Sequence, residues 1–144
     1  MTDVAYAYAN ARLHFAQGDF AWKAATTTMY MALYTSSLTP DQLNDTVYSN
    51  TNELATAAGY TQGGYQMTLN DPAIVGSAPS AYAKLYSSDV TWPSPCTFTG
   101  VRTVVIYKNT GTKYLVGYMT YTADKAAQGG VFTVTCPADG WFDF

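Results

Sequence analysis

Charged side chains are scarce in this sequence. Only 12% of its 144 residues are Asp, Glu, Lys or Arg, and the formal net charge is −3. That charged share is about half of what soluble domains usually carry, so a freely diffusing monomer would have little charge repulsion from its neighbours. The seven Lys and Arg residues are scattered along the chain. Because phosphate backbones are bound by several cations on one surface, we expect no nucleic-acid partner.

Histidine and cysteine are also sparse. His14 is the single histidine, and Cys96 and Cys136 are the only cysteines. These are too few for a zinc site or a disulfide scaffold, so we predict no metal and no cofactor. Two free thiols are expected, because the strands predicted below place the cysteines at opposite ends of a sheet. A bridge to a neighbouring subunit is the alternative.

Recognisable catalytic motifs are lacking. The sequence has no G-x-S-x-G, no H-E-x-x-H and no Cys–His signature, and His14 has no acid, cysteine or second histidine in a plausible ligand position. The glycine-rich stretch 59–65 lacks the GxxxxGK[ST] pattern, which favours a strand entry with positive φ over a phosphate loop. We therefore predict a protein that is not an enzyme.

Long apolar runs and an export signal are missing too. No segment is long and apolar enough to cross a bilayer, and Met1-Thr2-Asp3 lacks the basic and then apolar layout of a secretion signal. We expect neither a membrane partner nor Sec export.

Aromatic residues, in contrast, are abundant. The chain has 13 Tyr and 3 Trp, whose side chains offer large and rigid contact area. Together with the low charge, they predict a large contact with other proteins; the alternative is that Tyr is simply common in β-proteins. The candidate interface residues are Tyr30, Tyr34, Trp92, Trp141, Phe142 and Phe144.

β-branched and aromatic residues concentrate between Trp92 and Cys136. The expected strands are Thr97–Tyr107, Tyr114–Tyr121 and Val131–Cys136, joined by a hairpin turn at Lys108–Gly111 and a longer connection at Ala123–Gly130. Both faces of the first strand are apolar. We therefore expect a second sheet, a helix or another subunit on each face.

The remaining sequence predicts one helix and further strands. The helix is expected over Asp3–Gln17, with Asp3 as N-cap and Gly18 at the C-terminal end. Further strands are expected at Thr26–Ser36, Tyr65–Asn70 and Ala81–Asp89, and Pro93 and Pro95 should mark a sheet edge or crossover. We predict one domain over 1–144, with a helix at about 3–17 and β-structure from about 20. Its class is mainly β: an antiparallel β-sandwich or flattened barrel of six to seven strands.

Six short motifs occur in an order that resembles a group of small virion proteins of tailed bacteriophages. They are Ser36–Pro40, Gly59–Gly64, Asp89–Trp92, Arg102–Gly111, Leu115–Tyr118 and Gly129–Gly140. The resemblance covers about residues 20–140; Cys136-Pro137 and the aromatic end at 141–144 depart from it. It implies a β-rich structural protein encoded among head or tail genes, and it supplies no site residue.

The resemblance and the composition together favour a capsid decoration (cement) protein that stabilises the head shell. Such a protein would bind copies of itself, as a trimer, and other virion proteins such as the major capsid protein. It would reside in the virion and be assembled in the cytoplasm of a bacterial host. A tail, neck or fibre component is the first alternative. The second is a glycan-binding module that uses Trp92, Trp141 and several Tyr as a stacking platform.

Overall fold

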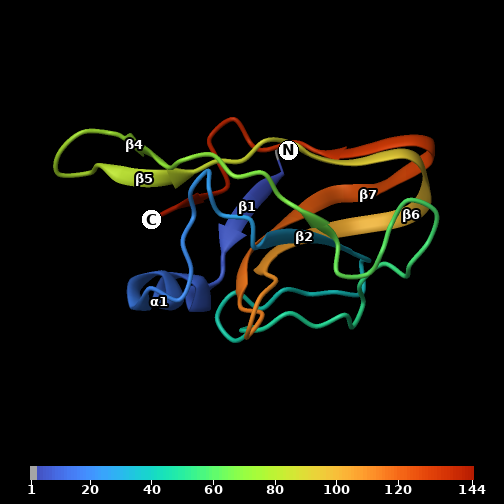
Figure 1. Ribbon diagram of the computed structural model, residues 1–144, viewed down its shortest axis with the longest axis horizontal. Helices are drawn as coiled ribbons and strands as arrows, with labels where there is room; N and C mark the ends of the chain where they lie inside the picture. The colour runs from blue at the N-terminus through green and yellow to red at the C-terminus, as the bar shows by residue number, and fades with distance from the viewer. Residues whose placement is uncertain (1–2) are drawn as a thin grey trace.

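The computed structural model describes residues 3–144, which form two antiparallel sheets and one short helix (Figure 1). Strands of the first sheet lie in the order β1-β7-β6-β2-β3, and those of the second in the order β4-β5-β8. The elements are β1 Val4–Ala7, α1 Ala9–Gln17, β2 Met29–Tyr34, β3 Tyr65–Gln66, β4 Ala73–Val75, β5 Tyr82–Leu85, β6 Val90–Lys108, β7 Leu115–Val134 and β8 Phe142–Asp143. The mainly β class is confirmed, and the described residues form no closed barrel.

The central feature is a ribbon of two very long strands, β6 and β7. Figure 1 shows that the pair bends back at one end of the molecule, so that one half of the ribbon lies above the other half. In one half of the ribbon Val90 pairs with Val134, and in the other half Val104 pairs with Met119. Val90, Val134, Val104 and Met119 are buried in one cluster. The inner core therefore lies between the two halves of one folded ribbon.

The predicted three-strand meander is corrected by this ribbon. The stretch expected as a third strand, 131–136, is mostly the end of β7, and the expected connection 123–130 is strand as well. Pro93 and Pro95 lie inside β6, where the pairing shifts between Trp92 and Cys96. Glycines with positive φ stand on both strands near the bend, Gly100 at 77° and Gly129 at 76°. Bulges and glycines bend a strand without ending it, so the turn signals in this region are bends of a continuous ribbon.

Both cysteines are free, as predicted, but for a different reason. Cys96 lies opposite Gly130 on the ribbon and is fully buried. Cys136 follows β7 at the ribbon's other end, where its backbone N–H bonds the Asp89 carboxyl at 2.9 Å. The two cysteines are apart because they lie at different positions along one antiparallel pair of strands, and not because a three-strand sheet places them at its two ends.

The N-terminal prediction is wrong in its first half. Val4–Ala7 forms strand β1 against β7, and the helix begins only at Ala9 with Tyr8 as N-cap. Asp3 does not cap the helix; its carboxyl accepts the Thr122 N–H at 3.1 Å. The predicted C-terminal end is confirmed, because Gly18 has φ 81° and ends the helix. Pairing with β7 satisfies the backbone of 4–7, a contact that local propensity cannot reveal.

The outer face of the five-stranded sheet is covered by the chain itself. Residues between β2 and β3 pack there, and Leu38 and Tyr48 contact a cluster that includes Tyr34, Val105 and Tyr107. The expected coverage of both faces is confirmed, but an irregular segment covers the outer face, and not the second sheet, helix or subunit that the sequence predicted. Tyr30 and Tyr34 of β2, which were predicted as interface residues, belong to or pack against this same covered cluster.

The remaining strands agree with the predictions only in part. β2 and β5 lie within their predicted ranges, β3 keeps two residues of its predicted six, and β4 and β8 were not predicted. The turn at Lys108–Gly111 does connect β6 and β7. Within residues 3–144, no helix has the length and apolarity that crossing a membrane requires.

Candidate functional site

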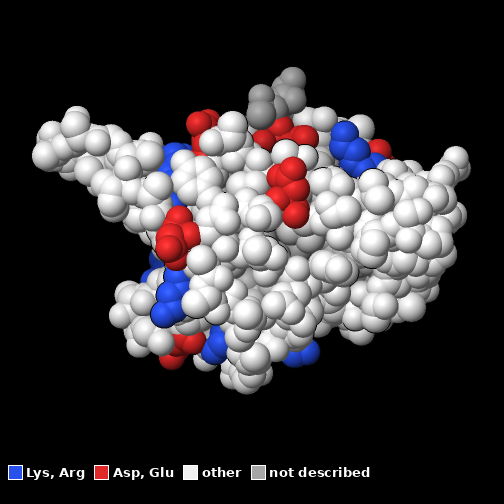
Figure 2. All heavy atoms as spheres, turned by 45° about the horizontal axis from the view of Figure 1, so that its top comes forward, with Lys and Arg blue, Asp and Glu red and all other residues white. Residues whose placement is uncertain are grey.

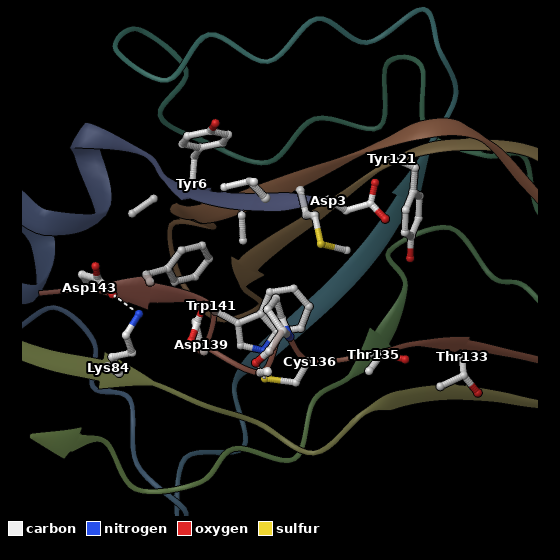
Figure 3. A pocket seen from close by; sticks show the side chains of 18 of the residues that line it. Asp3, Tyr6, Lys84, Tyr121, Thr133, Thr135, Cys136, Asp139, Trp141 and Asp143 are labelled. Atoms are coloured by element: carbon white, nitrogen blue, oxygen red, sulfur yellow. Dashed lines mark hydrogen bonds and ion pairs between the residues drawn. The ribbon is translucent and has the colours of Figure 1, made fainter. Parts of the chain in front are cut away.

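A cleft of about 960 Å³ lies beside strand β1 (Figure 3). One wall is β1 itself, and the opposite wall combines the end of β7 with the C-terminal segment 135–143. Met119, near the start of β7, also lines it. The cleft therefore occupies the open side of the folded ribbon, where the edges of its two halves face each other.

The deeper part of the cleft is apolar because the C-terminal rings dock there. Trp141 and Phe142 are 2% and 4% exposed. Trp141 Nε1 donates to Ser87 Oγ at 2.8 Å, so its polar atom is satisfied. The Phe142 ring lies over Gly117, where an added Cβ would come within 2.0 Å of Phe142 Cζ. The aromatic end of the chain thus folds onto its own domain, which is one of the two arrangements that so apolar an end allows.

The rim of the cleft carries charges of both signs. Lys84 Nζ bonds Asp143 Oδ1 at 2.9 Å, and this hydrogen bond raises the pKa of the lysine above its ordinary value. Asp3, Arg12 and Lys125 add further charges of mixed sign. Within residues 3–144, no group of three His, Cys, Asp or Glu side chains is placed to hold a metal ion. A mixed rim over an apolar floor suits a polypeptide better than a compact anion.

Strand β1 is an edge strand whose outward backbone groups open onto the cleft. The Tyr8 N–H donates to the Val116 carbonyl at 3.0 Å, and the β1–β7 register continues from that pair. In an antiparallel ladder, the backbone groups of successive residues face the partner strand and the opposite side in turn. The backbone groups of Tyr6 and Val4 therefore also bond β7, whereas those of Ala5 and Ala7 face away from it. The Ala7 carbonyl accepts Gln42 Nε2 at 2.7 Å. Within residues 3–144, the N–H and C=O of Ala5 form no hydrogen bond.

A second free edge belongs to the hairpin β4–β5, which projects from the body (Figure 1). Ala83 exchanges two backbone hydrogen bonds with Phe144 of the C-terminal segment, each 2.8 Å long. By the same alternation, Tyr82 and Lys84 bond Val75 and Ala73 of β4, and the N–H and C=O of Ile74 face outward. The Ile74 side chain is 76% exposed. Residues 73–83 contain no charged side chain, and the projecting tip in Figure 2 is accordingly uncharged.

A buried polar network fixes the segment that covers the outer face. Glu53, the only glutamate of the chain, is 6% exposed. Its carboxyl oxygens accept the Tyr60 hydroxyl at 2.6 Å, the Gly63 N–H at 2.6 Å and the Tyr48 hydroxyl. Tyr60 Oη in turn accepts the Leu33 N–H at 3.0 Å, which ties the network to β2. All these donors belong to this chain, so the network serves the fold.

His14 has an acidic partner that sequence spacing did not reveal. Its Nδ1 lies 2.5 Å from Asp19 Oδ2, and its ring stacks on Tyr114 with the ring centroids 3.6 Å apart. Gly18 reverses the chain at the end of α1 and so brings Asp19 back to the helix. The pair lies near the surface, at the end of α1, and it belongs to neither the cleft nor the Glu53 network.

Most of the predicted interface residues belong to the core and not to the surface. Tyr34, Trp92, Trp141 and Phe142 are at most 4% exposed, and only Tyr30 and Phe144 are half-buried. A side chain sealed within its own domain cannot contribute contact area to another protein. The expected surface is therefore corrected: the abundant rings build this chain's own core.

Other apolar residues are exposed and were missed by sequence reasoning. They are Val4, Tyr6, Leu13, Leu43, Val47, Tyr65, Ile74, Tyr82 and Val131. A signal for one of them was present: Ala73-Ile74-Val75 is a short apolar run between Pro72 and Gly76. The exposure of Val4 and Tyr6 became visible only once β1 was known to lie at a sheet edge.

Comparison of the chain with models of protein families, with curated proteins and with solved structures finds no match in any of the three. The cleft, the two free strand edges and the composition are therefore the features of this chain that bear on its function.

Buried tyrosines make the fold sensitive to alkali. Burial raises the pKa of Tyr107 and of Tyr121 to about 12, and it raises the pKa of Tyr34 further still. Well below the ordinary tyrosine pKa of about 10, both folded and unfolded chains are protonated, and stability does not depend on these groups. From about pH 9 upward the unfolded chain releases protons that the folded chain keeps, so we expect stability to fall. Denaturation midpoints measured from about pH 7 to 12 should stay level at first and then fall from about pH 9 upward; a flat profile would contradict this.

Proposed function

We propose that this protein is a non-enzymatic structural component of a tailed bacteriophage particle, acting as a capsid decoration protein on the head shell. The observation that carries the proposal is the coexistence, on one weakly charged chain, of an unpaired strand edge beside a cleft and an uncharged projecting arm. Monomeric β-proteins usually protect such edges with charge, proline or a covering loop. Here β1 and β4 carry no charged residue, so association with other subunits is the economical explanation.

The arrangement of the sheets also suits such a role. We propose that the folded ribbon and the strands beside it act as a small sandwich-like body, and that the hairpin β4–β5 serves as an arm that reaches a neighbour. An accessory protein on a repeating lattice gains binding strength from many weak contacts rather than from one deep site. The order of the six virion-protein motifs in the sequence supports the same assignment.

The copy number in purified particles tests this proposal. We expect quantitative mass spectrometry of phage purified by density gradient to find the chain at hundreds of copies per particle, in proportion to the major capsid protein. A handful to a few dozen copies would favour a tail, neck or fibre component instead. Absence from washed particles, with the protein present in the infected cell, would overturn the structural role.

The glycan-binding alternative loses the two Trp rings of its proposed platform, although Tyr6, Tyr65 and Tyr82 are exposed. Trp92 and Trp141 are 1% and 2% exposed, so neither ring can stack on a sugar without the domain opening. No other observation favours that function.

A further inference from the structure

We propose that strand β4 of one copy adds to the free edge of β1 in a neighbouring copy, antiparallel and with Ile74 opposite Ala5. The inference rests on the proposed structural role, and it names the partner of the cleft: a second copy of this chain. Strand addition at an exposed edge is a common mode of association, in which backbone hydrogen bonds give affinity and side-chain pockets give register.

The hydrogen-bonding groups of the two edges are complementary. On β1, the alternation with β7 leaves the N–H and C=O of Ala5 without a partner among residues 3–144, while the Ala7 carbonyl already accepts Gln42 Nε2. On β4, the N–H and C=O of Ile74 are free, because Val75 and Ala73 bond β5. A hydrogen-bonded antiparallel pair exchanges two bonds between two directly opposed residues. Ala5 and Ile74 meet that requirement with no change in either chain.

Side-chain orientation then selects the same register. Ala5 is paired with Met119, and Met119 is paired with Val104, so these three side chains form a row across the sheet. This row faces the inner core. Opposed residues project to the same face of a sheet, so Ile74 of the neighbouring copy would enter the cleft beside Ala5 and extend this row. Its side chain, 76% exposed in the single chain, would become buried.

The outer face gains a matching contact. With Ile74 opposite Ala5, Val75 lies opposite Val4 and Ala73 lies opposite Tyr6. Val4 and Tyr6 are 50% and 47% exposed, and neither β1 nor β4 carries a charge that would oppose the approach. A shift by one residue would turn Ile74 to the outer face and leave the cleft unfilled, so the register is specified.

The contact joins different surfaces of the two copies. Figure 1 shows the hairpin β4–β5 extending away from the body that carries β1, so a chain cannot fill its own cleft without refolding the arm. Arm-into-cleft contacts are heterologous and form a ring when the rotation between copies closes. The trimer expected from the sequence is such a ring, with three arms in three clefts.

Cysteine pairs test the register directly. We would mix a Val4→Cys protein with a Val75→Cys protein, both carrying Cys136→Ser, and oxidise them at high concentration. Opposed residues of a non-hydrogen-bonded pair have Cα atoms close enough for a disulfide. We expect the Val4–Val75 mixture to give about tenfold more cross-linked dimer than a matched Val4–Ala73 mixture, which is out of register. Equal yields, or no cross-link in either mixture, would overturn the proposal.

Proline substitutions test the same contact without a label. Ile74→Pro and Ala5→Pro each remove a backbone N–H that forms no bond to any of the residues 3–144, so the fold should be kept, as edge strands tolerate proline. We expect both variants to sediment as monomers under conditions in which the parent and Ile74→Val sediment as oligomers, with unchanged thermal midpoints. Ala83→Pro is the control for damage within the chain, because the Ala83 N–H donates to Phe144. A parent that sediments as a monomer at these concentrations, or an Ile74→Pro protein that still assembles, would contradict strand addition.

These outcomes separate the two proposals. A monomeric chain without cross-links that is still present at hundreds of copies per particle would refute strand addition and leave the decoration role standing. If the chain forms in-register cross-links but is absent from particles, strand addition stands and the decoration role is refuted.

Discussion

Replacing Gly64 by alanine is expected to destabilise the protein by more than about 4 kcal/mol, near the upper end of single-residue effects. Gly64 has φ +81°, and a Cβ at this position would lie 1.9 Å from the Met31 carbonyl oxygen and 2.8 Å from the Ala32 Cα. Both neighbours are backbone atoms of the buried strand β2, which cannot move aside as a side chain would. Strand β3 would have to leave β2, and the network at Glu53 and Gly63 would separate with it. Urea unfolding followed by tryptophan fluorescence measures the loss.

Gly18→Ala is the matched control for this change. Gly18 has the same φ of +81°, but nothing lies within 4 Å of an added Cβ. Only the cost of a left-handed alanine should appear there, about 1–2 kcal/mol. If the two variants lose equal stability, backbone crowding at Gly64 is not the cause and the packing of β3 on β2 is described wrongly.

Glu53→Gln is expected to cost about 3 kcal/mol, the second-largest effect. The carboxyl group accepts three hydrogen bonds, from Tyr48, Tyr60 and Gly63, at a position only 6% exposed. Glutamine replaces one acceptor oxygen by an NH₂ group, so at least one buried donor would face another donor. An unsatisfied buried polar group costs about 1–3 kcal/mol, and bonds to a charged acceptor add to that. The loss should appear in the same urea titration.

Two further variants assign the effect to the network. Tyr60→Phe removes the hydroxyl that links Glu53 to the Leu33 N–H, and combined with Glu53→Gln it should cost less than the sum of the single changes, because both act on one network. Asp124→Asn changes an acid that pairs with Arg102 near the surface at 2.7 Å and should cost less than about 1 kcal/mol. Additive costs, or a Glu53→Gln protein as stable as Asp124→Asn, would mean that the network contributes little.

Local sequence signals succeeded where an element is fixed by its own residues. The strand predicted over Thr26–Ser36 contains β2, whose residues Met29, Met31 and Leu33 are fully buried. Gly18 ends the helix, and the glycines of 59–64 adopt the positive φ values that their turn requires. Each of these features depends on backbone preferences or on a period of two, which a single sequence displays directly.

Local signals failed where a partner strand or a docking surface decides the outcome. Val4–Ala7 resembles a helix start but is a strand because β7 offers it an edge. Gly129, Pro93 and Pro95 read as breaks between strands, yet the two strands pair across them as one bent ribbon. The interface residues failed for a related reason: composition counts aromatic rings but not their location, and Trp92, Trp141 and Phe142 are the core of their own chain.

The sequence by itself determined the chemical character of this protein: mainly β, low in charge, rich in rings and without a recognisable catalytic motif. Composition and periodicity are properties of the residues alone. Only the tertiary structure decided which backbone groups remain free, since that depends on which strand occupies which edge. Ala5 and Ile74 are unremarkable in the sequence, and they become the candidate contact because β7 and β5 bond the residues on either side of them.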